Sequence, residues 1–343
     1  MGTRLVGLFA SIALLAASSA SPIDPARAFL MAAFDVSPAD IARLDCGEVF
    51  SRTLDVHNQR EVATLGIVRI ATSPSRYIER FRDIRTFKHT GDVLQVGTFS
   101  SPPQPGDLAA LAIDDRDLKR LRECRVGNCD IRLPADAIES LRRDVDWRAV
   151  GASQQAAGVI RHVLLNYVAG YAPGRTMPTM EYADRTPRLN VGREFASLMD
   201  DDPMTLKYLP RLRRHLLGHP NSSPEQFTDF TYWSKELVRR RPVVSITHVA
   251  IAPAVDHSPI AYAVASKQIY AMHYYDASLG LTLLVPDGTA AEPATYVVYV
   301  NRSRIDLFEG VFGGMIRRIV AGRARGLVSE QLVRLQRVLA DPR

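Results

Sequence analysis

Apolar and polar positions alternate over long stretches of the C-terminal third of the chain. The alternation predicts four strands, Pro242–Ile251, Ile260–Tyr275, Leu279–Val285 and Ala294–Ile305. After them the spacing becomes helical, with an apolar stripe that runs almost to the C-terminus. An antiparallel sheet buries at least one face, and a helix with an apolar stripe can cover that face. We therefore expect an α+β fold in which a long C-terminal helix covers a curved antiparallel sheet.

The N-terminal part of the chain predicts further strands of this kind. Glu48–Asp55 and Glu61–Ala71 alternate and follow each other closely, which is typical of a hairpin. Ser73-Pro74 then supplies a helix N-cap followed by proline, and it opens a short helix over Arg76–Ile84. Another strand is predicted at Val93–Phe99. The predicted order is strand, short helix, strand.

The region at about 101–240 has a mainly helical pattern. Helices are predicted over Ala135–Trp147, over Ala152–Tyr167 and around Pro203–Leu217, with a brief strand at Cys129–Leu133 between the proline-rich turn and the first helix. A strand at Phe227–Val238 then leads into the C-terminal sheet. This region is therefore predicted to be a large helical insertion.

This order of elements resembles that of the START-like, helix-grip superfamily. Residues 61–99 are similar to the opening of that fold, and residues 242–340 are similar to its closing strands and helix, joined at Tyr299–Ile319. The resemblance implies a single domain over 21–343, with the helical insertion at about 101–240. It also implies a hydrophobic cavity between the sheet and the C-terminal helix. Members of the superfamily mostly bind lipids, sterols, polyketides or similar apolar ligands, and a minority catalyse reactions in that cavity.

The first twenty residues have the pattern of a signal peptide. Arg4 precedes an apolar run, Leu5–Ala17, and small residues follow it up to Ala20. A signal peptide over 1–20 with cleavage near Ala20 is expected, which places the mature protein in the periplasm or outside the cell. An uncleaved N-terminal anchor is the alternative.

Three cysteines bear on this compartment. Cys124 and Cys129 flank Gly127-Asn128, whose turn chemistry brings the two ends together. In an oxidising compartment they can form a disulfide, and the alternative is two unpaired buried thiols. Cys46 has no assigned partner. A metal site is not predicted from these cysteines, since no histidine lies near the pair.

The net charge is modest, with 43 basic and 37 acidic residues and a formal value of +6. Such an excess fits an anionic membrane surface or an acidic ligand, and it fits plain solubility as well. A nucleic-acid partner is not expected, because no basic stripe with interleaved aromatic residues is present. The predicted last helix gathers four basic residues on one side, which form either a solvated face or a contact with anionic headgroups; they are Arg317, Arg318, Arg323 and Arg325.

The strand Ile260–Tyr275 supplies the candidate ligand-binding residues. Simple alternation places large side chains on one of its faces, as expected for a cavity wall; they are Tyr262, Gln268, Tyr270, Met272 and Tyr274. Lys267 then points to the other face, so Arg302 or Gln268 is the better candidate for a polar anchor. We hypothesise a protein that binds or carries a lipidic or other apolar small molecule, without a cofactor or metal.

Two alternatives remain open. An enzyme can use His248, His273 and Asp276 as an acid–base group or as metal ligands, if the fold brings them together. A serine nucleophile at Ser278 or Ser234 is disfavoured, since neither lies in a Gly-x-Ser-x-Gly turn. The third possibility is an envelope interaction module without a ligand.

Overall fold

The computed structural model describes residues 24–89, 91–171, 179–218, 227–238, 240–253, 258–308 and 313–340. The signal peptide predicted over 1–20 and its cleavage position lie outside the described residues. Among the helices described, none is both long enough and apolar enough to cross a membrane.

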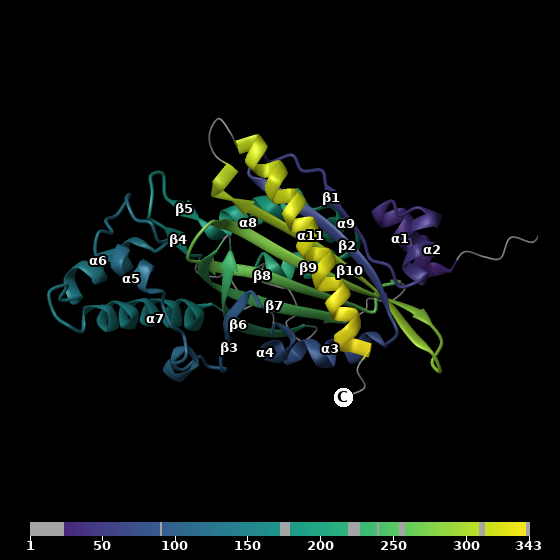
Figure 1. The fold of residues 1–343 in the computed structure, drawn as a ribbon, viewed down its shortest axis with the longest axis horizontal. Helices are drawn as coiled ribbons and strands as arrows, with labels where there is room; N and C mark the ends of the chain where they lie inside the picture. The colour runs from purple at the N-terminus through teal and green to yellow at the C-terminus, as the bar shows by residue number, and fades with distance from the viewer. Residues whose placement is uncertain are drawn as a thin grey trace, which may run out of the picture.

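Eight strands form one antiparallel sheet in the order β1-β2-β10-β9-β8-β7-β6-β3 (Figure 1). The structure confirms an α+β fold with a large antiparallel sheet and a C-terminal helix packed on it. Strands β2 and β10, far apart in sequence, pair along their length, with Tyr299 opposite Gly66. The strands are β1 (Phe50–Leu54), β2 (Glu61–Ile70), β3 (Val93–Thr98), β6 (Thr228–Val238), β7 (Arg241–Pro253), β8 (Tyr262–Ala271), β9 (Tyr275–Gly288) and β10 (Pro293–Ile305).

Helix α11 (Gly313–Ala340) lies diagonally across one face of the sheet, which we call the α11 face (Figure 1). It passes close to β2 at Gly66, where an added Cβ would lie 2.6 Å from Leu332 Cδ1 and closer still to Val328. Glycine is therefore needed for the helix to approach the strand. Helices α3 (Pro74–Arg82) and α4 (Ile84–Phe87) pack on the same apolar cluster, which includes Val68, Tyr77, Phe81, Val264, Leu284, Val297, Val328 and Leu332.

The opposite face of the sheet carries a second apolar cluster. Leu65 and Ile67 flank Gly66 and therefore point away from α11. They share a buried cluster with Phe29, Phe195 and Leu212 from the helices. The helices on this face are α1 (Pro25–Phe34), α2 (Pro38–Asp45), α8 (Val191–Asp200), α9 (Pro203–Tyr208) and α10 (Pro210–Leu216).

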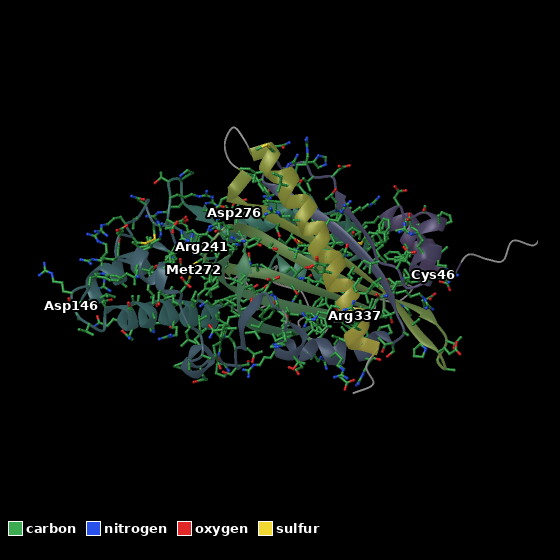
Figure 2. All side chains as sticks on the ribbon, in the orientation of Figure 1. Cys46, Asp146, Arg241, Met272, Asp276 and Arg337 are labelled. Atoms are coloured by element: carbon green, nitrogen blue, oxygen red, sulfur yellow. A yellow bond between two sulfur atoms is a disulfide. The ribbon has the colours of Figure 1, made fainter. Side chains whose placement is uncertain are left out.

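A third cluster joins the end of the sheet to helices that extend beyond it (Figure 1). Met272 and Arg241 lie at this end of the molecule, and Cys46 lies at the other (Figure 2). The disulfide Cys124–Cys129 is present here, as predicted, and Cys46 is free and exposed. The elements are α5 (Asp115–Leu121), α6 (Ala135–Asp144), α7 (Ala152–Gly170) and the small pair β4 (Glu181–Tyr182) and β5 (Leu189–Asn190).

Two local expectations differ from the structure. The strand expected over Ile260–Tyr275 is shorter, because β8 ends at Ala271 and Tyr274, with a φ of 68°, turns the chain into β9. The brief strand expected at Cys129–Leu133 does not form. There the amides of Cys129 and Arg132 donate to carbonyls of two different segments, those of Asp184 and Met272, so no regular ladder develops.

Candidate functional site

A half-enclosed pocket of about 350 Å³ opens on the face of the sheet opposite α11. Its floor is β8, through Lys267 and Ile269, and its walls come from α7, α8 and the end of α10. Aromatic and aliphatic side chains dominate, and the two charged groups are both cations. The lining residues are Tyr167, Tyr171, Thr179, Asn190, Val191, Gly192, Arg193, Phe195, Ala196, Leu217, Gly218, Lys267 and Ile269.

Lys267 is the buried charged group of this pocket. Its ammonium donates a hydrogen bond of 2.8 Å to the carbonyl oxygen of Leu216. It also lies 4.5 Å from the centre of the Phe195 ring and 5.7 Å from that of Tyr171. Only 7% of the residue is exposed. A carbonyl and two ring faces stabilise a cation less than water does, and burial lowers the pKa of Lys267 to about 7.

Two buried histidines and a carboxylate lie on the same face as Lys267. His248 of β7 is the cross-strand partner of Lys267, and Asp229 comes from β6. Asp229 Oδ1 lies 2.8 Å from His215 Nε2 and 2.7 Å from His248 Nε2. His215 belongs to α10, so three elements supply the three groups. We call these residues the His215–Asp229–His248 cluster.

Tyr171 connects the cluster to the pocket. Its hydroxyl lies 3.1 Å from His248 Nδ1, and its ring lines the pocket. Burial lowers the pKa of His248, and Asp229 only partly opposes this effect. Burial alone would raise the pKa of Asp229, but hydrogen bonds from both histidines outweigh it and hold that pKa below its ordinary value. The favoured state is therefore a neutral His248 beside an ionised Asp229.

The expected cavity-lining residues do not share one surface. The pairing of β7 with β8 shifts between Ile246 and Thr247, which leaves Ile269 as an extra residue in a β-bulge. Tyr262 therefore packs with the cluster under α11, and Gln268 lies on that same face. Beyond the bulge the remaining residues pack elsewhere, with Tyr270 and Met272 in the cluster of α5–α7 and Tyr274 near the start of α11.

Arg302, the expected anchor, is bound within the protein. It contacts Glu61 at 2.6 Å, Asp202 at 3.4 Å and the carbonyl oxygen of Asp201. Arg304 joins the same group through Asp201. These ion pairs tie β10 to β2 and to the α8–α9 turn. The guanidinium of Arg302 therefore serves the structure, and it does not line the pocket.

His248, His273 and Asp276 are not brought together. His273 Nε2 lies 3.1 Å from Asp117, whose other oxygen receives Arg241 at 2.7 Å. Asp276 is bound to three guanidiniums, at distances of 2.7 to 3.3 Å from Arg60, Arg132 and Arg185. Burial raises the pKa of Asp276, although these three cations oppose it. The three residues share no hydrogen-bond partner among the described residues.

Sequence reasoning missed most of this site. His215 and Asp229 lie in different elements, and no spacing marks them as partners of His248. Tyr171 lies just beyond the helix predicted over Ala152–Tyr167, and no sequence motif marks it as a partner of His248. One signal was present, since alternation placed Lys267 on the face opposite the large side chains, beside Ala265 and Ile269.

Comparison with protein families gave no match for this chain. A search of the curated proteins likewise found no similar sequence.

Proposed function

We propose that the protein binds a small apolar molecule that carries one acidic group, in the pocket over Lys267. The observation that carries the proposal concerns the pocket wall. It is largely apolar and aromatic, and the charged residues among its described lining are both cations. Lys267 lies at the floor and Arg193, which is exposed, lies at the rim, while the described lining residues include no carboxylate. Pockets of a few hundred Å³ with few, convergent polar groups are typical of small-molecule sites.

The position of Lys267 supports an anionic head rather than a neutral one. One ammonium proton is used by the Leu216 carbonyl, so the remaining N–H donors are directed to no other hydrogen-bond acceptor among the described residues. A carboxylate placed there would compensate a buried cation that has no counter-ion among the described residues. The hydrocarbon part of the ligand would then contact Phe195, Tyr171 and Val191.

This proposal keeps the expected class of ligand but changes the expected location. The sequence placed the cavity between the sheet and α11, as the helix-grip resemblance implies. The observed strand order and the position of α11 support that resemblance. On the α11 face, Ser266, Gln268 and Asn301 keep part of their surface accessible. An experiment must therefore distinguish binding in the pocket over Lys267 from binding on the α11 face.

Neighbouring residues of β8 allow this separation. We would titrate the full mature chain with the fluorescent apolar anion 1-anilinonaphthalene-8-sulfonate, and compete it with decanoate and with decanol. Lys267→Met removes the cation of the pocket, and Gln268→Leu changes the α11 face only. We expect decanoate to compete better than decanol, and Lys267→Met to weaken decanoate binding roughly 10-fold or more, since a charged hydrogen bond contributes about 1.5–3 kcal/mol.

The control variant decides between the two positions. Gln268→Leu should leave competition by decanoate unchanged, and near-ultraviolet circular dichroism should show the native fold for both variants. A loss of binding in Gln268→Leu with full binding in Lys267→Met would reject the pocket and return the site to the α11 face. Equal affinity in all three proteins would reject both positions.

We also propose that this binding takes place in the periplasm or outside the cell, at an anionic membrane surface. The disulfide Cys124–Cys129 supports the compartment. The outer side of α11 supports the surface, because Arg318, Arg323 and Arg325 are exposed there and Arg317 is half-buried. Four apolar residues are exposed on the same helix, Met315, Ile319, Leu327 and Val338. Basic and apolar side chains on one exposed helix are typical of interfacial helices.

A further inference from the structure

We propose that His215, Asp229 and His248 bind one divalent transition ion of the zinc type. Binding of this ion does not depend on a ligand in the pocket. One ligand atom from each residue, the two imidazole nitrogens and a carboxylate oxygen, lies within 4.8 Å of the others. Two histidines and one carboxylate are an established ligand set for zinc and for iron.

Both imidazoles meet the carboxylate through the same type of nitrogen. His215 Nε2 and His248 Nε2 point at a single oxygen of Asp229, from α10 on one side and β7 on the other. A tetrahedral zinc with bonds of about 2.0–2.1 Å separates its ligand atoms by roughly 3.3 Å. The observed contacts of 2.7 and 2.8 Å therefore have to lengthen by about half an ångström, and the two imidazole nitrogens, which lie within 4.8 Å of each other, have to reach a similar spacing.

The surroundings of the cluster favour a neutral, oriented ligand. Both histidines are fully buried, and Asp229 keeps 19% of its side chain accessible. Tyr171 holds the remaining nitrogen of His248, and a hydrogen bond of this kind fixes the tautomer and the ring plane of a metal ligand. Phe227 stacks on His215 with ring centres 4.2 Å apart, which restricts the rotation of that ring.

The ligand set also selects the kind of cation. Mg²⁺ and Ca²⁺ prefer six or more oxygen ligands, whereas two imidazoles suit zinc, cobalt, iron or copper. Three protein ligands leave one coordination position open, which water or an anionic group can fill. Tyr171 contacts His248 and lines the pocket, so the cluster lies close to the pocket wall.

The test is a metal titration of the full mature chain after treatment with a chelator. Co²⁺ is the spectroscopic probe, because a tetrahedral site gives a visible absorption band, and Zn²⁺ and Mg²⁺ are the competitors. We expect the band to saturate at one ion per chain, Zn²⁺ to abolish it and Mg²⁺ to have no effect. Zn²⁺ should also raise the melting temperature, since it binds only the folded chain.

Three variants test whether the Co²⁺ absorption band arises from the His215–Asp229–His248 cluster. His215→Gln and His248→Gln keep an N–H donor for Asp229 but remove an imidazole, and each should weaken binding of Co²⁺ roughly 100-fold or more. His273→Gln is the matched control, because His273 is also buried and bound to a carboxylate but lies outside the cluster. Its affinity for Co²⁺ should equal that of the wild type.

Three results would overturn the proposal. They are the absence of a stoichiometric band in the wild type, a band that survives in both cluster variants, and an equal loss in His273→Gln. If the glutamine variants fail to fold, X-ray absorption spectroscopy of the zinc-loaded wild type decides, since the proposal requires two imidazoles in the first coordination sphere and other ligand counts reject it.

Discussion

Lys267 shows how a single buried residue can lower the stability of the fold. In the unfolded chain its amine keeps the ordinary pKa of 10.5, while burial in the fold lowers that pKa to about 7. Between these values the unfolded chain binds more protons than the folded one. The free energy of unfolding must therefore rise as the pH rises above 7, by at most about 1.4 kcal/mol per pH unit.

The variant Lys267→Met removes this cost. We expect it to be more stable than the wild type at pH 7, by about 1–4 kcal/mol, because an apolar side chain fills the site without desolvating a charge. The difference should shrink as the pH approaches about 9. Urea unfolding at several pH values, with chelator present, measures it. A variant less stable than the wild type at pH 7 would contradict this account of Lys267.

At the scale of elements, the contact between α11 and β2 depends on one glycine. A Cβ at Gly66 would overlap Leu332 and Val328, both buried in the cluster under α11. We expect Gly66→Ala to lower the free energy of unfolding by about 1–3 kcal/mol, as overpacking does in other cores. The measurement is chemical unfolding followed by tryptophan fluorescence.

A double mutant tests whether the helix is the cause. Leu332→Ala removes one of the two overlapping side chains, so the loss in Gly66→Ala/Leu332→Ala should be smaller than the sum of the two single losses. Gly158→Ala is the control, since open space surrounds that position in α7 and alanine favours a helix. Strict additivity of the two losses would show that α11 does not press on Gly66.

At the scale of the whole molecule, the net charge and the exposed side of α11 both favour binding to an anionic membrane surface. The formal net charge is +6, and the exposed side of α11 carries arginines beside apolar residues. We expect binding to vesicles of phosphatidylglycerol and not to vesicles of phosphatidylcholine. Arg318→Ala/Arg325→Ala should weaken it roughly 30-fold, at about 1 kcal/mol for each arginine.

Co-sedimentation with vesicles at low and high salt measures this effect. The matched control is Arg43→Ala/Arg143→Ala, which removes two exposed arginines from α2 and α6 and so changes the net charge equally. If this control weakens binding as much as the α11 variant, net charge is the cause and α11 is not the contact surface.

Most of the regular elements and the disulfide could be predicted from the sequence alone. Strands β2, β7, β9 and β10 are predictable because they are mostly apolar and buried on both faces, and because they contain many β-branched residues, which favour a pleated backbone. The pair Cys124 and Cys129 was predictable because Gly127-Asn128 is a local turn. Each of these features depends on interactions between residues close together in the chain.

The candidate site could not be predicted from the sequence, because contacts between distant segments form it. The bulge at Ile269 depends on how β8 pairs with β7, and it reverses the faces of Tyr270 and Met272 that simple alternation predicts. Asp229 meets His248 because β6 pairs with β7, and His215 reaches them because α10 packs on β7. The spacing of residues in the sequence does not reveal such contacts, because they form only when segments far apart in the chain pack together.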